Sequence, residues 1–260
     1  MKMIGWFSGG VTSAIAIKCA IDAGHDVSIY YFETGLHHPD HTRFLKDMEN
    51  VYGQKITVVR NKKFKDVHDV ILKTRYLNGP SGARCTNELK KQMRIQLEKM
   101  IDFNHQIFGF EAETKQINRA IRFNEQYPEA KAVYPLIEKG WNKERCLIEL
   151  MNLGVDVPAM YKLGYSNSNC IGCVKGGAGY WNKIRRDFPE IFNQMAKIER
   201  EINASCLKKD KKKLFLDQLD PEAGRHEDIS LPECGVTCPV ELDFLPIAKI
   251  EQLDRSGLFD

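Results

Sequence analysis

A glycine pair between an apolar strand and an apolar-faced helix constrains the fold of this chain most. The run Met3–Phe7 predicts a buried strand, residues 14–21 predict a helix, and the two are joined by Ser8-Gly9-Gly10-Val11-Thr12-Ser13. Glycines let a ligand approach closely, and the start of a helix offers free N–H groups and a positive dipole end. We therefore expect this loop to bind a phosphate or pyrophosphate. Taken alone, the glycine pair is equally compatible with a tight strand-to-helix turn.

Strand and helix patterns alternate through the first half of the chain. Further strands are predicted at 27–32, 55–60 and 105–110, and further helices at 41–52, 65–75 and 114–127. This alternation favours a doubly wound α/β fold with a mostly parallel sheet, in which ligands bind outside the carboxyl ends of the strands. The second half is mainly helical and contains most of the clustered cysteines. We expect a nucleotide-binding domain at 1–140 and a helical, cysteine-containing region at 141–260 packed on it.

Composition narrows the class of protein. Of the 260 residues, 43% are hydrophobic, which is enough for a sizeable core. The net charge of +3 is too small to indicate a nucleic-acid partner, and the lysine-rich stretch 208–213 is more simply a solvated surface. No apolar run approaches the roughly 20 residues of a membrane span, and the first apolar run is too short for a signal peptide. We expect a cytoplasmic protein with no membrane association, and the sequence leaves a homo-oligomer open.

A second polar stretch follows the end of the second predicted strand. It begins with Glu33-Thr34-Gly35 and continues through two histidines to Pro39-Asp40. Taken alone, it is more simply a polar loop with two solvated histidines. Because the carboxyl ends of parallel strands meet at one edge of a sheet, we nevertheless expect it to lie beside the first loop.

These two stretches, in this order, resemble motifs of the phosphoadenosine phosphosulfate (PAPS) reductase family, which belongs to the PP-loop ATP pyrophosphatase superfamily. The first is similar to the superfamily's Ser-Gly-Gly-x-x-Ser loop, although Thr12 stands where many members have Asp. The second is similar to Asp-Thr-Gly followed by Pro-Glu-Thr, with Glu33 and Asp40 as acidic substitutes. The resemblance implies a PP-loop fold of the HUP-like type and an adenine nucleotide as ligand. The first loop would hold its phosphates, and Thr34 and Gly35 would line the adenosine pocket.

A third stretch, at the end of the fourth predicted strand, departs from the family pattern. The family has Gly followed by Arg there, whereas Gly109 is followed by Phe110 in this chain. The resemblance implies that Gly109 contributes to the nucleotide site, and that Arg119 or Arg122 on the following helix supplies the missing positive charge. For Arg122, a solvated helix face is at least as good an interpretation.

Clustered cysteines predict a metal or iron–sulfur site. In a reducing compartment, eight cysteines are not expected to form a disulfide framework. Cys170 and Cys173 form a Cys-x-x-Cys motif in a glycine-rich loop, which favours two thiolates on one ion or cluster over a redox dithiol. Cys85 lies far upstream, and this long gap resembles the iron–sulfur type of sulfonucleotide reductase, although that type has a Cys-Cys pair. Cys206 has no evident partner.

The source of a fourth ligand is open from the sequence. A [4Fe–4S] cluster usually has four cysteine ligands, so Cys234 or Cys238 completes the set, or one iron keeps an open site as in three-cysteine tRNA thiolases. Glu233-Cys234-Gly235 resembles the tail of the reductases, in which the cysteine attacks the sulfonyl sulfur. Cys234 is therefore the candidate catalytic nucleophile, and Cys238 the candidate fourth ligand. Alternatively, both cysteines join Cys170 and Cys173 as four zinc ligands.

Three functions follow from these observations. The first is a reductase-like oxidoreductase acting on APS or PAPS, with a [4Fe–4S] cluster. The second is an ATP-dependent sulfurtransferase that adenylates an oxygen of tRNA, DNA or a small molecule and releases pyrophosphate with the help of Mg²⁺. The third is a nucleotide-binding module that is stabilised by zinc and is not an enzyme. An electron-donor or sulfur-donor protein is the expected partner in the first two cases.

Overall fold

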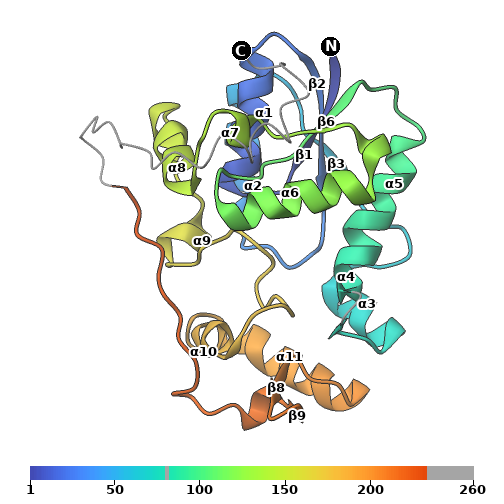
Figure 1. Cartoon of the computed structure of the whole chain (residues 1–260). Helices are drawn as coiled ribbons and strands as arrows, with labels where there is room; N and C mark the ends of the chain where they lie inside the picture. The colour runs from blue at the N-terminus through green and yellow to red at the C-terminus, as the bar shows by residue number, and fades with distance from the viewer. Residues whose placement is uncertain (80–81, 233–260) are drawn as a thin grey trace.

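A five-stranded, all-parallel sheet lies at the centre of the computed structural model, which describes residues 1–79 and 82–232 (Figure 1). The strands are β1 (Lys2–Phe7), β2 (Asp26–Phe32), β3 (Thr57–Val59), β6 (His105–Ile107) and β7 (Ala132–Val133). Their order is β3-β2-β1-β6-β7, so the chain winds outward from β1 on one side and then on the other. This confirms the predicted doubly wound α/β fold. Ligands of such sheets bind at the carboxyl ends of the strands where the order reverses, here between β1 and β6.

Helices around the sheet complete a first hydrophobic core. They are α1 (Val11–Asp22), α2 (His41–Tyr52), α7 (Pro135–Glu138) and α8 (Lys143–Asn152). The helix α6 (Thr114–Gln126) packs in a smaller cluster with Phe110 and Tyr134. The helix α1 is apolar on most of its surface because it is enclosed by other elements, and its side chains share one buried cluster with Cys146 and Leu147 of α8. The core of the sheet therefore extends past residue 140. The division at 140 stays a prediction.

A second core is built below the first by elements from the middle and the second half of the chain (Figure 1). Its helices are α3 (Val67–Thr74), α4 (Arg84–Thr86), α9 (Ala159–Lys162), α10 (Ala178–Asp187) and α11 (Pro189–Ile202), together with the short helices η1 (Asn87–Lys91) and η3 (Leu216–Gln218). The helix α5 (Gln92–Glu98) continues η1, and the short helix η2 (Pro128–Ala130) precedes β7. Two short hairpins are also present, β4 (Asn78–Gly79) with β5 (Gly82–Ala83) and β8 (Leu207–Lys209) with β9 (Lys212–Leu214). Trp181 of α10 and Met195 of α11 are fully buried in this second core.

Several predicted elements differ from the structure in extent. The strand predicted at 55–60 is only Thr57–Val59, because the backbone N–H of Ile56 donates to the Glu49 side chain instead of to a neighbouring strand. The lysine-rich stretch is not merely solvated but forms the β8–β9 hairpin. Its turn residues Asp210 and Lys211 both have positive φ (50° and 63°), as a tight two-residue hairpin turn requires. None of the helices within the described residues is long and apolar enough to cross a membrane.

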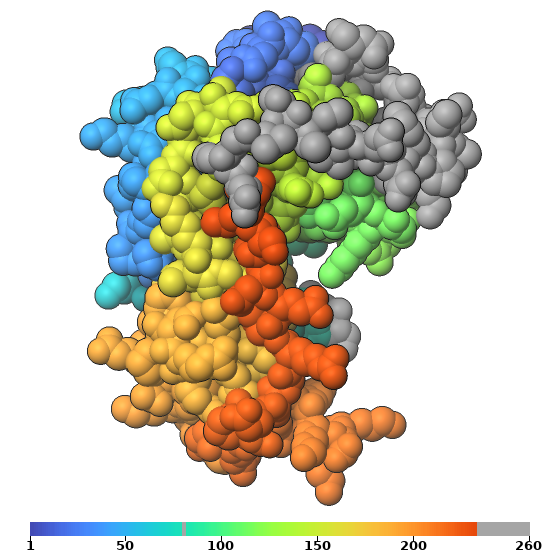
Figure 2. All heavy atoms as spheres, turned by 90° about the vertical axis from the view of Figure 1, so that its left-hand side faces the viewer, coloured from blue at the N-terminus to red at the C-terminus, as the bar shows by residue number. Residues whose placement is uncertain are grey.

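The segment from 220 to 232 joins the second core back to the first. It runs up one face of the molecule in Figure 2, from the helices of the second core towards the sheet. The N–H of Ile229 donates to the carbonyl of Gly164 at 3.1 Å, and Ile229 and Leu231 pack against the first core. Cys234 and Cys238 follow this segment and lie outside the described residues.

Candidate functional site

The loop after β1 is held in shape by Ser13, a buried residue in the first turn of α1. The hydroxyl of Ser13 donates to the carbonyl of Gly10 at 2.9 Å and accepts the backbone N–H of Ser8 at 3.0 Å. The hydroxyls of Ser8 and Ser13 are 2.8 Å apart. Gly9 has φ +79°, a conformation that favours glycine. The loop is therefore a fixed turn, and the N–H groups of Thr12 and Ser13 in the first turn of α1 have no earlier carbonyl within the helix to bond.

Two side chains from distant segments flank this loop. The ring of His41, at the start of α2, lies so close to Gly9 that a Cβ on Gly9 would stand 1.9 Å from its Cε1 atom. On the other side, the hydroxyl of Tyr161 in α9 accepts the N–H of Val11 at 3.2 Å. The predicted phosphate loop is therefore partly covered by protein, and one of its N–H groups is already bonded.

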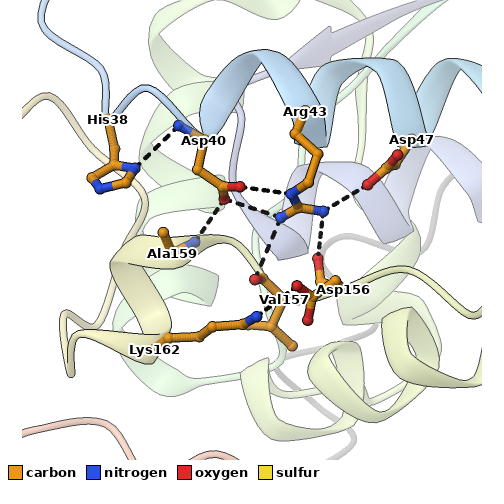
Figure 3. Close-up of polar contacts among 8 residues, drawn as sticks. All are labelled: His38, Asp40, Arg43, Asp47, Asp156, Val157, Ala159 and Lys162. Carbon is orange, nitrogen blue, oxygen red and sulfur yellow. Dashed lines mark hydrogen bonds and ion pairs between the residues drawn. The ribbon is translucent and has the colours of Figure 1, made fainter.

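A polar network fastens the start of α2 to the segment that carries Tyr161. Figure 3 shows the carboxylate of Asp40 between the guanidinium of Arg43 and the backbone N–H of Ala159, with Asp40–Arg43 distances of 2.6 and 3.0 Å and a distance of 2.8 Å to Ala159. Arg43 also donates to the carbonyl of Asp156 at 3.1 Å and to Asp47 at 2.6 Å. The Arg43 guanidinium holds the pKa of Asp40 below its usual range. Asp40 therefore connects the start of α2 with the segment that carries Tyr161, and both of its carboxylate oxygens already accept hydrogen bonds.

The second predicted stretch lies at the end of β2, as expected. Thr34 is only 2% exposed, and its hydroxyl lies 2.7 Å from His37 Nε2 and 2.9 Å from Cys170 Sγ. A carboxylate oxygen of Glu33 accepts the N–H of Gly35 at 2.9 Å. Thr34 therefore connects the motif after β2 directly with the Cys-x-x-Cys loop, although the two are far apart in sequence.

The third predicted stretch also reaches the loop. A Cβ on Gly109 would stand 2.5 Å from the backbone N of Ser13, so only glycine lets the end of β6 approach α1 this closely. Arg119, in contrast, lies over the ring of Phe110, with 4.3 Å between its guanidinium carbon and the ring centre. Phe110 in turn stacks on Tyr134. Among the described contacts, none joins Arg119 to the loop, and its proposed role towards a nucleotide stays a prediction.

A buried ion pair links the end of β6 to the loop before the Cys-x-x-Cys motif. Glu111 is 4% exposed and lies 3.5 Å from the amine of Lys143, while burial raises the pKa of Glu111. The same amine donates to the carbonyl of Ser166 at 3.1 Å. Lys143 therefore places a positive charge between the two halves of the molecule, and no sequence motif marks it.

Cysteines from three parts of the chain gather at the second core. Burial raises the pKa of the Cys85 thiol to about 11, and charges on Cys170 and Cys173 act in the same direction. Burial also raises the pKa of Cys206, together with Glu199, Cys173 and Cys85. Cys85, Cys170 and Cys206 pack against the same core, and Cys173 lines one cavity with Cys170.

Cys206 is the member of this thiol group that sequence reasoning missed. It follows α11, which packs on α10, and α10 in turn follows the Cys-x-x-Cys loop, so no short spacing marks Cys206. Its backbone N–H donates to the fully buried carboxylate of Glu199, which fixes its position. Across 1–79 and 82–232, no three His, Cys, Asp or Glu side chains converge closely enough to hold a single metal ion. Thiols are nevertheless the donor set that iron–sulfur clusters and structural zinc use.

A cavity of about 270 Å³ opens beside two of these thiols. Its lining includes Cys170 and Cys173 together with Tyr165, Asn167, Lys175 and Tyr180. A molecule in this cavity would therefore lie beside both thiols.

The structure thus brings together most of the predicted site. The loop residues Ser8, Gly9, Gly10, Thr12 and Ser13 lie with Gly109 at one edge of the sheet, and Glu33, Thr34 and Gly35 lie at the end of the next strand. Through Thr34, this edge meets Cys170, and through Cys170 it meets Cys85 and Cys173. Their functional roles stay predictions. Those of Cys234 and Cys238 fall outside the described residues.

Comparison with known proteins gives two findings. Residues 2–178 match the family described as the phosphoadenosine phosphosulfate reductase domain. A relative in Methanocaldococcus jannaschii, named uncharacterized protein MJ0066, is 24% identical over 197 residues, which cover 75% of this chain and 41% of the relative. The chain therefore spans less than half the length of this relative. The family match includes the loop after β1, the motif after β2 and the Cys-x-x-Cys loop.

Proposed function

The chain belongs to the phosphoadenosine phosphosulfate reductase family, and on that premise we propose that it is a sulfonucleotide reductase-like enzyme with an iron–sulfur cluster. Members of the family bind adenine nucleotides. The loop after β1 would hold the phosphates or sulfate of the nucleotide, and the motif after β2 would line the adenosine pocket.

One contact carries this proposal. Thr34, in the motif after β2, lies 2.9 Å from the sulfur of Cys170. Because a cysteine thiol contacts a residue of the nucleotide motif directly, a nucleotide bound there would lie close to the thiols, as a reaction between a nucleotide and sulfur requires. A purely structural metal site has no need to be there.

The four gathered thiols would hold the cluster. Cys85, Cys170, Cys173 and Cys206 would supply the four cysteine ligands that a [4Fe–4S] cluster usually has, since three of them pack against one core and Cys173 lines a cavity with Cys170. When bound, the cluster would supply an electron-rich group of iron and polarisable sulfur near the sulfonucleotide. Because Cys206 completes the set, Cys234 would remain free to act as the nucleophile.

The reaction would then use Cys234 and an external dithiol. The thiolate of Cys234 attacks the sulfonyl sulfur of the bound sulfonucleotide, a sulfur–sulfur bond forms, and the sulfur–oxygen bond breaks as the nucleotide phosphate leaves with the electron pair. A thiolate of a dithiol donor protein attacks Cys234 Sγ and releases sulfite. The second thiol of the donor then restores the Cys234 thiol and leaves the donor as a disulfide.

Sulfite release tests this proposal. Anaerobically reconstituted protein with a dithiol reductant should release sulfite from APS or PAPS. The variant C234S should release none, whereas C238S, which changes the other cysteine of the same tail, should retain the activity. If cluster-loaded wild type releases no sulfite from either substrate, or if C234S remains active, the reductase proposal is wrong.

Metal content tests the ligand set separately. Wild type and C146S, which alters a buried cysteine of the first core, should bind the same amount of iron and show the same charge-transfer absorbance. The variants C85S, C170S, C173S and C206S should each lose most of it. Full iron content in C206S with loss in C238S would replace Cys206 by Cys238. One zinc per chain without iron would favour the nucleotide-binding module instead.

An ATP-dependent sulfurtransferase is a second candidate, favoured by the cavity beside Cys170 and Cys173. That cavity gives an acceptor molecule access to the thiols independently of the nucleotide loop. In this reaction Mg²⁺ would assist adenylation of an acceptor oxygen, and a sulfur nucleophile would then displace AMP. Pyrophosphate release from ATP that depends on an added tRNA, DNA or small molecule would support it. Absence of ATP binding in calorimetry would exclude it.

A further inference from the structure

His41 is a buried polar side chain that touches the nucleotide loop. It is 7% exposed, and its ring is packed against Gly9 on one face of the loop. The ring of His37 stacks on it, with centroids 4.4 Å apart and an angle of 19° between the planes. The ring of Tyr31 lies 4.8 Å away on another side. The imidazole is therefore held in place by aromatic and backbone contacts.

Both ring nitrogens of His41 are nevertheless without a hydrogen-bond partner in the described part of the chain. A buried polar atom that lacks a partner destabilises the folded protein, and such atoms in native structures usually mark a bound water, a ligand or a functional role. His37 Nδ1 also has no partner among the described residues. Two stacked imidazole rings beside the loop therefore carry unused polar atoms.

His37 differs from His41 because one of its nitrogens is anchored. Its Nε2 lies 2.7 Å from the hydroxyl of Thr34, which is also 2.9 Å from Cys170 Sγ. If Cys170 is a thiolate ligand, Thr34 donates its proton to the sulfur and accepts one from His37 Nε2. His37 is thereby fixed as a ring that stacks on His41 and holds its plane towards Gly9.

The surroundings keep both rings neutral. Burial lowers the pKa of His37 to about 3, with His41 and Lys90 acting in the same direction. Burial lowers the pKa of His41 to about 4, with Lys90 adding to this effect and Glu33 and Asp40 opposing it. At neutral pH, His41 therefore carries one N–H donor and one acceptor nitrogen.

We propose that His41 is a ligand of the nucleotide's phosphate chain, donating its ring N–H to a phosphate oxygen bound at the Gly9 loop, and that His37 is its positioning residue. This inference rests on the proposed nucleotide site. The ligand it calls for is a polyphosphate anion: a phosphate oxygen accepts the N–H that no protein group accepts, and the first turn of α1 supplies further donors. His41 would add a donor from α2 to a loop in which the N–H of Val11 is already bonded to Tyr161.

Nucleotide titration of matched variants tests the assignment. H41F keeps an aromatic ring that can stack on His37 and contact Gly9 but has no ring nitrogen. H68F is the control, because His68 is also buried with an unpartnered Nε2 but lies in α3, in the second core. We expect H41F to bind ATP and inorganic pyrophosphate about tenfold or more weakly than wild type, and adenosine unchanged, because hydrogen bonds to charged groups are the strong ones. H68F should bind all three like wild type.

The possible results separate this inference from the proposed function. If wild type binds ATP but H41F binds it within twofold of wild type, His41 is not a ligand and only the inference fails. The same conclusion follows if H41F loses adenosine as much as pyrophosphate, since the change then disturbs the whole loop. If wild type binds none of ATP, APS and PAPS, the proposed nucleotide site fails and the inference with it.

A measurement on wild type covers the case in which H41F does not fold. Long-range ¹H–¹⁵N spectra of the assigned histidines report which ring nitrogen carries the proton and whether it is hydrogen-bonded. Saturation with pyrophosphate should shift the protonated nitrogen of His41 and leave that of His68 unchanged. An unchanged His41 ring in the saturated protein would overturn the assignment.

Discussion

Replacing Gly9 by alanine tests whether the nucleotide loop is as tightly enclosed as the structure indicates. An L-residue at φ +79° costs about 1–2 kcal/mol, because its Cβ crowds the following carbonyl. The new Cβ would also stand 1.9 Å from His41 Cε1, and relieving such overpacking typically costs about 1–3 kcal/mol. His41 cannot swing away freely, since His37 and Tyr31 hold its ring. We therefore expect G9A to lower the free energy of unfolding by about 2–5 kcal/mol.

Gly24 provides the matched control. It has nearly the same backbone conformation, φ +76°, but no atom lies within 4 Å of the Cβ that alanine would add. G24A should therefore show the backbone cost alone, about 1–2 kcal/mol. The difference between G9A and G24A isolates the contact with His41.

Urea denaturation of wild type, G9A, G24A, H41A and the G9A/H41A double variant completes the test. In an H41A background, the added methyl at Gly9 meets no ring, so the cost of G9A should fall to that of G24A, and the double-mutant cycle reports the coupling. If G9A costs no more than G24A in the wild-type background, the ring moves aside with little resistance. The reasoning that His41 is held against the loop would then be refuted, and the argument for it as a ligand would lose its geometric basis.

Three further outcomes are expected. D40N should lower the free energy of unfolding by about 1–3 kcal/mol and weaken ATP binding, since an amide cannot hold Arg43 as a carboxylate does; denaturation and calorimetry measure both effects. The free energy of unfolding should be highest above about pH 6.5 and should decrease as the pH drops towards 4. The pKa values of His37 (about 3) and His41 (about 4) in the folded protein lie below those of histidines in the unfolded chain, so the unfolded chain binds protons first as the pH falls. H41F should flatten this slope in denaturation curves recorded over that range. Iron or zinc loading should increase with pH, because burial raises the pKa of Cys85 to about 11 and the thiol must lose its proton to bind metal; the metal content after reconstitution at several pH values checks this.

The fold could be predicted because local patterns and global topology agree. The apolar run before Ser8 and the helix after it are separated by a glycine pair, and strand and helix patterns then alternate with short connections. Such a pattern leaves few topologies other than a parallel sheet. The limits of β3 could not be predicted in this way, because they depend on the side chain of Glu49, which bonds the N–H of Ile56. The β8–β9 hairpin is not predicted from the sequence, because its turn residues Asp210 and Lys211 adopt positive φ without a glycine or asparagine, and the surrounding lysines indicate only a solvated surface.

The candidate site was predictable only where it follows strand ends. Strand order predicts that Thr34 lies near the first loop, the family resemblance predicts the same for Gly109, and the structure has both at that edge of the sheet. Tyr161 and Cys206 belong to no motif. Each reaches the site because helices pack together, and the order of helices in the sequence does not predict which of them will be neighbours. Arg119 was selected as a substitute for a missing arginine, but the structure places its guanidinium over Phe110.

Asp40 shows why motif residues and site residues need not coincide. The sequence places it among the acidic residues of a nucleotide motif, yet its carboxylate is occupied by Arg43 and by the N–H of Ala159. The hydrogen bond between Asp40 and the N–H of Ala159 holds α2 against the segment that carries Tyr161. Asp40 therefore helps to position both His41 and Tyr161 beside the loop. A carboxylate at this position thus acts on the phosphate loop through the positions of its neighbours. The residue that offers a free donor to a ligand is the next one along the chain, His41, whose ring nitrogens the protein leaves unbonded among the residues described.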